Sequence, residues 1–580
     1  MEIRRGIGVS GGYAIGEAFV VDREEYRISR RTLPPTQVEA QVERFQKAAN
    51  AAAQGIRTQV EGMPKRVREA AAAILEAQIR WLQEPALHEE IIGEIRRSLR
   101  TADYAASYVI RRKIKAMEES DAAFARRVAS DLVELEKSLL RELVGGNSRE
   151  TLAELSGRAI IVAHDLSPGQ TIGLDRTKVL GILTEAGGPT SHTAIVARSL
   201  GIPAVVGVEG VTNAIGGGDT VILDAGQGTV LLNPDEATLK RYQAMERNFV
   251  LAEQRRAKET QDLPAITKDG VRIEIFANIE APDEIPAALE HGAEGIGLYR
   301  TEFLFLGHDF APTEKDHYEA YTRATRLLGK RRIIIRTLDL GADKLPDDGF
   351  DREANPFLGT RAIRLCFERP DMFRTQLRAI LRSTAMGNVG IMIPMISTLG
   401  EVKRAKEIVD DVRAELRREE EPAGEGISFG IMIEVPSAAV TADLLAPHVD
   451  FMSVGTNDLI AYSMAVDRAN KHVASLFQPG HPAVLRLLKS VIEAGATHKK
   501  SVSICGEMSS DITFTLLLLG LGLRNFSVVP PVIPELKKLI RSVTIDEAKR
   551  IAAKALTFDD ARDVSDFLRT ETRAIMPEMS

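Results

Sequence analysis

Two apolar runs of similar sequence, VGIMIPM at residues 389–395 and SFGIMIE at residues 428–434, indicate how the C-terminal half of this chain folds. Each has the length of a buried β-strand, and a stretch with helical periodicity separates them. Six further runs of this kind begin at Val271, Ala293, Arg332, Val449, Ser501 and Asn525. Eight strands that alternate with helices predict a (β/α)8 barrel over residues 263–580.

The rest of the 580-residue chain divides into a helical part and a mixed part. Residues 31–147 are rich in Ala, Glu, Arg and Leu with helical periodicity, which predicts four or five packed helices. In residues 148–233, short apolar runs alternate with Gly-rich turns and predict a small α/β domain. Strand-like residues 1–30 are expected to join that domain, which makes the helical part an insertion. Residues 234–262 predict a linker helix, so the expected fold class is multidomain α/β.

Composition excludes several classes of protein. Hydrophobic residues are 44% and charged residues 27% of the chain, as in globular proteins. The net charge of −7, without a basic tail, argues against nucleic-acid binding. Only Cys366 and Cys505 are present, which excludes a disulfide framework and favours a cytoplasmic location. The most apolar run, residues 514–523, is shorter than the ~20 residues that cross a bilayer, so no membrane insertion is expected.

Polar residues follow the predicted barrel strands where the active sites of such barrels lie. They are Arg300, Thr301 and Glu302, then Arg336, Asp339 and Lys344, then Glu434, then Asn457 and Asp458, then Cys505, Gly506 and Glu507. Mg²⁺ prefers oxygen ligands, which Glu434 and Asp458 supply. Arg300, Arg336 and Arg361 are suited to phosphate and carboxylate oxygens. Cys505 is a candidate general acid or base.

A second site is predicted at GGPTSHTAIVAR, residues 187–198. A Gly-Gly turn precedes a helix that Thr190 is expected to N-cap, so His192 falls in the first helical turn. Free N–H groups and the helix dipole favour an attached anion there, which makes His192 a candidate phosphoryl-carrying nucleophile. The GIGVSG stretch at residues 6–11 fits a dinucleotide-binding pattern, but a strand-like run follows instead of a helix, so that reading is excluded.

Seven motifs together closely resemble the phosphoenolpyruvate–protein phosphotransferase family, Enzyme I of the bacterial phosphotransferase system. They are GGPTSHTAIVARSLGIPAVVG, GLYRTEFLF, RTLDLGADK, NPFLGTRAIR, GIMIEVPSA, SVGTNDLIAYSMAVDRAN and ICGEM, and the resemblance covers essentially the whole chain. It implies that His192 takes a phosphoryl group from phosphoenolpyruvate and passes it to a histidine of HPr or an HPr-like carrier, the first step of sugar uptake.

The resemblance also assigns expected roles to single residues. Arg300, Arg336, Asn457 and Arg468 match substrate-binding positions, Glu434 and Asp458 match the Mg²⁺ ligands, and Cys505 matches the proposed proton donor to the enolate. Asp458 is thereby expected both to bind the substrate and to act as a metal ligand. Pro189 and Ala461 depart from residues that are common at their positions.

At the level of domains, the resemblance implies a homodimer formed through the barrels and a helical HPr-docking subdomain. The domain order, together with the resemblance, further predicts that the domain carrying His192 swings between two sites. One is the barrel, where the phosphoryl donor binds, and the other is the helical part, where the acceptor docks. The hinges are expected near the ends of the 234–262 helix and near Gly145 and Gly146.

Three alternatives stay open at this stage. A paralogue that feeds a nitrogen-regulatory carrier is the nearest, although such paralogues usually carry an additional N-terminal sensory domain. A relative of pyruvate phosphate dikinase or phosphoenolpyruvate synthase shares single motifs, but no part of the chain is predicted to hold a nucleotide. A regulatory scaffold with a decayed site is disfavoured, because His192, the arginines, both carboxylates and Cys505 are all present.

Overall fold

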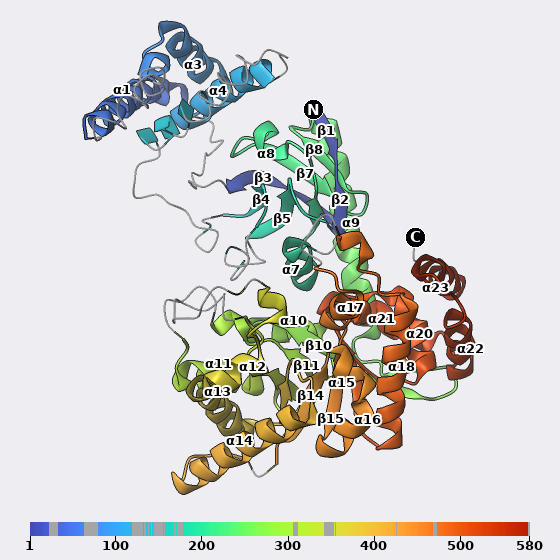
Figure 1. Ribbon diagram of the computed structural model, residues 1–580. Helices are drawn as coiled ribbons and strands as arrows, with labels where there is room; N and C mark the ends of the chain where they lie inside the picture. Colours follow the sequence, from blue (N-terminus) through green and yellow to red (C-terminus); the bar gives the residue numbers. More distant parts are fainter. Residues whose placement is uncertain are drawn as a thin grey trace. The chain divides into compact units, whose positions relative to one another are not determined.

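The computed structural model describes the chain in two compact units, Met1–Phe249 and Val250–Ser580 (Figure 1). The described residues are 1–21, 33–62, 79–118, 132, 135–136, 138–140, 142–143, 155, 157–166, 170, 174, 178–188, 191–305, 311–341, 353, 355–424, 426–467 and 473–577. The predicted domain boundaries at 30/31 and 147/148 lie outside these ranges, and the four-domain division stays a prediction.

The second unit contains the predicted barrel. Its strands are β10 (Arg272–Ile279), β11 (Ile296–Tyr299), β12 (Ile333–Arg336), β13 (Val389–Ile393), β14 (Ser428–Ile433), β15 (Phe451–Gly455), β16 (Ser501–Cys505) and β17 (Asn525–Val528). Neighbours are parallel in chain order, and β10 pairs with both β17 and β11, which closes the ring. A short strand, β9 (Ala265–Ile266), extends β10 in the antiparallel direction. The (β/α)8 prediction is confirmed.

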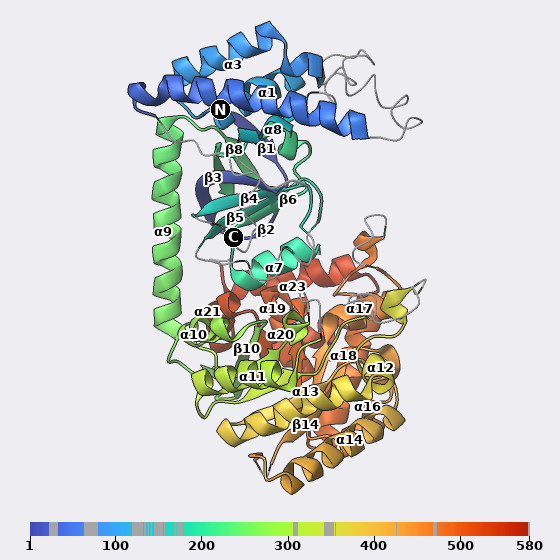
Figure 2. The same ribbon diagram turned by 90° about the vertical axis from the view of Figure 1, so that its left-hand side faces the viewer.

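Helices cover the outside of the barrel (Figures 1 and 2). They are α10 (Ile285–Glu290), α11 (Glu314–Leu328), α12 (Ile363–Glu368), α13 (Pro370–Ser383), α14 (Leu399–Arg418), α15 (Pro436–Val440), α16 (Ala442–Leu445), α17 (Thr456–Met464), α18 (Pro482–Thr497), α19 (Glu507–Ser510), α20 (Thr515–Leu521), α21 (Ile533–Arg541), α22 (Ile545–Ala555) and α23 (Ala561–Ile575). Because both faces of the sheet are covered, every residue of β13 and β15 is buried, which explains their unbroken apolar sequence. Gly522, in the left-handed conformation, ends α20.

The first unit is built on a mixed sheet in the order β1-β8-β7-β3-β4-β5-β6-β2. The strands are β1 (Glu2–Arg5), β2 (Ile7–Ser10), β3 (Tyr13–Val21), β4 (Ala159–Ala163), β5 (Val179–Thr184), β6 (Ala204–Val206), β7 (Thr220–Asp224) and β8 (Thr229–Leu232). Because β3 pairs with β4 and β7, the N-terminal strands belong to this sheet and the helical part between them is inserted. A strand, β3, follows the GIGVSG stretch, which confirms that the dinucleotide-binding context is absent there.

The inserted part has its own apolar core. Its described helices are α1 (Val38–Gly62), α3 (Pro85–Ser98) and α4 (Ala102–Glu118). Phe45, Ile91 and Ile110 are almost fully buried between them, together with Leu135 and Leu139 from a further helical stretch. Pro85 is the first residue of α3, a position where its missing N–H costs no helical hydrogen bond.

A long helix, α9 (Glu236–Thr260), lies where the linker helix was predicted and is uninterrupted in Figure 2. In the first unit, Tyr242 near its start packs with Ile222 and Leu231 of the sheet. In the second unit, the buried Lys537 ammonium donates to the carbonyl oxygens of Thr260 at 3.1 Å and Gln261 at 2.9 Å. Within the described ranges, no helix has both the length and the hydropathy that a membrane span requires.

Candidate functional site

The carboxyl ends of the barrel strands gather a buried set of alternating charges. Arg336, the last residue of β12, pairs with Glu302 at 2.8 Å and with Asp339 at 2.9 Å. Burial alone would lower the pKa of Arg336, but the two carboxylates raise it above its usual value. Arg336 is therefore a permanent cation at this end of the barrel.

A second arginine continues the set. Arg361 donates to Asp339 at 2.8 Å and to Asp458 at 3.2 Å, and its other terminal nitrogen reaches the Tyr462 hydroxyl at 3.3 Å. Burial opposes ionisation of Asp339, but Arg361 and Arg336 outweigh it and hold the pKa of Asp339 below its usual value. Asp339 therefore stays ionised between two guanidinium groups.

Three carboxylates of this set form a candidate metal centre. One oxygen from each of Asp339, Glu434 and Asp458 lies within 4.8 Å of the others, and all three residues are buried. Burial raises the pKa of Glu434 to about 8, and the charges of Asp339 and Asp458 add to this. Mutual repulsion of this kind is relieved when a cation binds, and an all-oxygen donor set suits a hard cation such as Mg²⁺. The predicted pair Glu434 and Asp458 is thus close together, and Asp339 joins it.

Backbone geometry sets the direction of Glu434. The Met395 N–H donates to its Oε1 at 2.6 Å from the loop after β13. Gly455, at the end of β15, leaves the necessary space, since a Cβ on this residue would lie 2.7 Å from Glu434 Oε2. The glycine in the SVGTND motif is therefore explained by the close approach of this carboxylate.

Asn457 and Cys505 lie on neighbouring strand ends. Asn457, in the first turn of α17, accepts a hydrogen bond from the Glu507 N–H at 2.9 Å. Gly506, between Cys505 and Glu507 in the chain, has φ +95°, and a Cβ on this residue would lie 2.5 Å from Thr456 Oγ1. Only glycine fits both the conformation and the space, which accounts for the CGE motif.

Cys505 belongs to the interior of the barrel, where it packs with Met392, Met432 and Phe451. Its Sγ donates to the Val454 carbonyl oxygen at 3.4 Å and accepts from Ser453 Oγ at 3.6 Å. Burial raises the pKa of Cys505 to about 11. The group is therefore a thiol near neutral pH, able to donate a proton and poorly suited to act as a base.

The remaining predicted barrel residues are placed unequally. Arg300, directly after β11, pairs with Glu280 at the end of β10 at 2.9 Å and is partly exposed. Arg300, Arg336, Arg361, Glu434, Asn457, Asp458 and Cys505 all lie at the same strand ends. Arg468 and Lys344 lie outside the described residues. Glu302, which pairs with Arg336, was not given a role from sequence, although its place after a strand marked it.

His192 is the first residue of helix α7 (His192–Leu200), in the first unit. The expected N-cap, Thr190, is wrong: Ser191 caps the helix, and its Oγ accepts a hydrogen bond from the Ala194 N–H at 3.3 Å. Ser191 is the cap because it directly precedes the first helical residue, so its hydroxyl group reaches the backbone N–H three residues further along the chain. The side chain of His192 lies outside what the structure describes, but its place in the first helical turn is confirmed.

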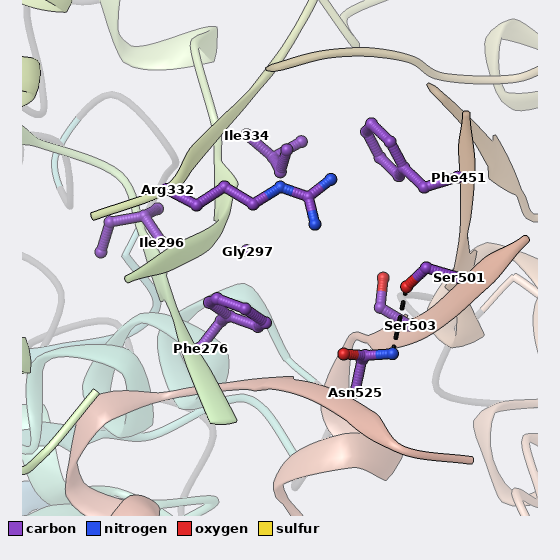
Figure 3. Close-up of a pocket in the computed structure, with 9 residues that line it drawn as sticks. All are labelled: Phe276, Ile296, Gly297, Arg332, Ile334, Phe451, Ser501, Ser503 and Asn525. Atoms are coloured by element: carbon purple, nitrogen blue, oxygen red, sulfur yellow. Dashed lines mark hydrogen bonds between the residues drawn. The ribbon is translucent and has the colours of Figure 1, made fainter. Parts of the chain in front are cut away.

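The opposite end of the barrel contains a small cavity of about 20 Å³ (Figure 3). Its lining residues include Phe276, Arg332, Phe451, Ser501 and Ser503. The Arg332 guanidinium extends across it and lies 4.8 Å from the centre of the Phe451 ring. The cavity is large enough for a water molecule but far too small for a phosphorylated metabolite.

Known proteins match the chain along most of its length. The family model described as "PEP-utilising enzyme, PEP-binding domain" matches residues 254–545. The models described as "PEP-utilising enzyme, mobile domain" and "PEP-utilising enzyme, N-terminal" match residues 155–228 and 5–127. The mobile-domain match contains His192, and the PEP-binding match contains the charged strand ends.

Full-length relatives carry a common name, phosphoenolpyruvate-protein phosphotransferase. One from Staphylococcus carnosus is 38% identical over 571 residues, which is 98% of this chain and 99% of the relative. One from Haemophilus influenzae is 39% identical over 97% and 98% of the two chains. One from Geobacillus stearothermophilus is 40% identical over 97% of each. Because identity at this level extends over the helical insertion, the sheet and the barrel together, the chain belongs to the phosphoenolpyruvate-protein phosphotransferase family.

Proposed function

We propose that this enzyme transfers the phosphoryl group of phosphoenolpyruvate to His192 and then to a histidine of HPr or an HPr-like carrier, the first step of the sugar phosphotransferase system. The observation that carries the proposal is the buried set of two arginines and three carboxylates at the barrel strand ends. It supplies both charge signs that a phosphorylated carboxylic acid and its metal ion require. The names of the full-length relatives support the same reaction.

Arg336 and Arg300 are proposed to bind the anionic substrate. Arg336 already uses both terminal nitrogens on Glu302 and Asp339, but among the described residues its Nε has no hydrogen-bond acceptor. Arg300 is partly exposed and its pairing with Glu280 is at the surface of the site. The two guanidinium groups therefore offer charge and donors to phosphate and carboxylate oxygens, with Asn457 and Arg468 proposed beside them.

Glu434 and Asp458, with Asp339, are proposed to hold Mg²⁺. When bound, the cation would neutralise charge on phosphate oxygens during transfer. Asp458 also accepts from Arg361, so one carboxylate connects the metal centre to the substrate-binding arginines. Arg361 is thereby proposed to orient Asp458 as well as to bind substrate.

Cys505 is proposed to protonate the product. When the phosphoryl group leaves phosphoenolpyruvate, the electron pair of the broken P–O bond stays on oxygen as the enolate of pyruvate. The enolate takes a proton at carbon from the Cys505 thiol, and the thiolate regains one from solvent. The raised pKa of Cys505, about 11, keeps the proton in place until the basic enolate forms.

Transfer also requires that His192 approach the barrel site. His192 belongs to the first unit and the charged strand ends to the second, whereas reacting atoms must come within ~3.5 Å. The domain carrying His192 is therefore proposed to swing, with hinges near the ends of α9 and near Gly145 and Gly146, which lie outside the described residues. A reversible disulfide that locks the sheet onto the helical insertion should permit donation to the carrier but block recharging until it is reduced. Recharging at the native rate while locked would exclude the swing.

Labelling tests the proposal directly. Phosphoenolpyruvate labelled in its phosphoryl group should label the full chain, and γ-labelled ATP should not. His192→Ala should lose the label while the barrel still binds phosphoenolpyruvate. The control is His164→Ala, which removes an exposed histidine of the same unit and should label normally. Normal labelling of His192→Ala, or labelling from ATP, would contradict the proposal.

Two alternatives are separated by the same assay. If the labelled enzyme discharges to a nitrogen-regulatory carrier far faster than to HPr, the paralogue reading replaces the sugar-transport one. Labelling from ATP favours the dikinase reading.

Assembly and location extend the proposal. A homodimer through the barrels is proposed, with the exposed Val440 and Leu444 side chains as candidate contacts, and sedimentation at several concentrations tests it. Two cysteines, both unpaired and buried, are consistent with a cytoplasmic enzyme.

A further inference from the structure

Behind the charged strand ends lies a buried amide that contacts two of the loops carrying them. Gln376 is in the middle of α13, on the outer layer of the barrel, and is 1% exposed. Its Oε1 accepts a hydrogen bond from the Leu338 N–H at 3.0 Å, in the loop after β12. Its Nε2 donates to Thr301 Oγ1 at 3.0 Å, in the loop after β11. One side chain therefore connects two neighbouring strand ends.

The hydrogen-bond directions around Gln376 are mutually consistent. Thr301 Oγ1, having accepted from the amide, donates its own proton to the Arg336 carbonyl oxygen at 3.0 Å. Nε2 also donates to the Tyr321 hydroxyl at 3.1 Å, and that hydroxyl lies 3.0 Å from Nδ1 of the buried His317. Each donor thus has an acceptor, and the Leu338 N–H requires that Oε1 be the amide atom facing it.

The connected loops are those that carry the proposed substrate groups. Thr301 lies between Arg300 and Glu302, and Leu338 lies between Arg336 and Asp339 in the chain. On the substrate side, Glu302 accepts from Arg336 at 2.8 Å and from the Asp339 N–H at 3.2 Å. The two loops are thus joined at the front by Glu302 and at the back by Gln376. The front connection depends on the charged Glu302 side chain, whereas the back connection is neutral and buried.

We propose that Gln376 is a positioning residue, which holds the loops after β11 and β12 in register so that Arg300 and Arg336 are preorganised for phosphoenolpyruvate. The inference rests on the proposed function, because its consequence is a change in substrate binding. A buried amide with both ends paired is costly to break and has one favoured geometry. Displacing catalytic groups by about 1 Å can reduce rates by up to ~100-fold, so a remote connection of this kind has measurable consequences.

Gln376→Met tests the proposal, since it keeps the length of the side chain and removes every hydrogen bond. The matched control is Tyr321→Phe, which removes a hydrogen-bond acceptor of the same amide but leaves its contacts to Thr301 and Leu338. Single-turnover labelling of the full chain at a range of phosphoenolpyruvate concentrations gives the half-saturating concentration and the rate at saturation. Thermal denaturation gives the stability of each variant.

The expected result is a split between the two variants. Both should lose stability, but Gln376→Met should raise the half-saturating phosphoenolpyruvate concentration about tenfold, with a smaller fall in the saturated rate. Tyr321→Phe should change both kinetic values less than about twofold. A structural role alone predicts that the two variants differ in neither kinetic value.

A second pair guards against loss of folding in Gln376→Met. Thr301→Val removes the hydroxyl that joins the amide to Arg336, and Thr301→Ser retains it. The valine variant should show the raised half-saturating concentration and the serine variant should restore most of the native value. Native half-saturation in Gln376→Met, or in Thr301→Val, would overturn the proposal. Failure of the unmodified enzyme to bind phosphoenolpyruvate would instead overturn the proposed function, and this inference with it.

Discussion

Two arginines at opposite ends of β12 have different surroundings. Arg336 ends β12 and lies between Glu302 and Asp339, whereas Arg332 directly precedes β12 and faces the Phe451 ring in a cavity of about 20 Å³. Both are partly or fully withdrawn from water, which by itself lowers the pKa of an arginine. Only at Arg336 do carboxylates reverse that effect, and the pKa of Arg332 is lowered.

The difference shows how one strand gives its two ends different chemistry. At the carboxyl end, the loops after β11, β12, β14 and β15 converge and bring charged side chains together. At the amino end, the aromatic ring of Phe451 and the hydroxyl groups of Ser501 and Ser503 surround a single cation. Substitutions at the two ends should therefore separate a site for an ionic substrate from an end that contributes to stability.

The largest effect is expected from the carboxylates. Glu434→Gln and Asp458→Asn each remove an anionic oxygen from the proposed Mg²⁺ centre. Each should lower the rate of labelling by phosphoenolpyruvate on the order of a thousandfold. Mn²⁺ binding followed by electron paramagnetic resonance should weaken in parallel. The matched control is Glu274→Gln at the other end of the barrel, where an exposed carboxylate is lost and activity should be retained. Unchanged Mn²⁺ affinity in both site variants would remove these residues from the metal centre.

The second prediction exchanges the same residue at both ends of β12. Arg336→Lys keeps the charge but cannot span Glu302 and Asp339 together, so kcat/KM should fall about a hundredfold. Arg332→Lys should leave kcat/KM within about twofold, because nothing at that end contacts the proposed substrate site. Similar kinetic losses in the two variants would show that the two ends are not functionally separate.

Much of this fold could be predicted from sequence because its strands are buried on both faces. VGIMIPM and SFGIMIE became β13 and β14, with Glu434 immediately after the second. Helix α9 could be predicted equally well, since residues 234–262 are highly charged and lack glycine. The predicted cap of α7, Thr190, is one position early, because both Thr190 and Ser191 are good N-caps and sequence alone does not rank adjacent candidates.

The site was less completely predictable. A strand-end position suggested Arg336, Glu434 and Asp458, but side-chain pairing depends on which loops are neighbours in space. That Asp339 is the third carboxylate of the candidate metal centre follows only from the three-dimensional arrangement of the closed barrel. Gln376 gave no signal at all, since a glutamine within an amphipathic helix is ordinarily a solvated residue.

The third prediction concerns pH and a histidine behind the active end. Burial lowers the pKa of His317 to about 4, so its neutral ring faces the Tyr321 hydroxyl near neutral pH. An unfolded chain binds this proton near pH 6.5, so it holds more protons than the folded one between pH 6.5 and 4. Stability should therefore fall as pH falls through this window, by at most ~3 kcal/mol from this group.

His317→Gln tests that contribution. The variant should be less stable than the native enzyme at pH 7.5, and the gap should narrow on acidification because the variant has no imidazole to protonate. Chemical denaturation of the full chain at pH 7.5, 6 and 5 provides the comparison. A gap that stays constant over this range would show that His317 is not the titrating group.

The smallest effect is expected at the amino end of β12. Arg332→Met retains an unbranched aliphatic chain but removes the guanidinium group that lies 4.8 Å from the centre of the Phe451 ring. A partly desolvated cation–π contact contributes about 1 kcal/mol, and the carboxylates of Glu274 and Asp450 also stabilise the charge of Arg332. Removing this half-buried charge also removes its desolvation cost. Because these effects oppose each other, the change in unfolding free energy should lie within about 1 kcal/mol of zero, with labelling unchanged. Arg331→Met, at the exposed neighbouring position, has the same change in net charge and separates a local contact from a general charge effect. A large loss of labelling in Arg332→Met alone would join the two ends of β12 into one functional unit and remove the contrast between them.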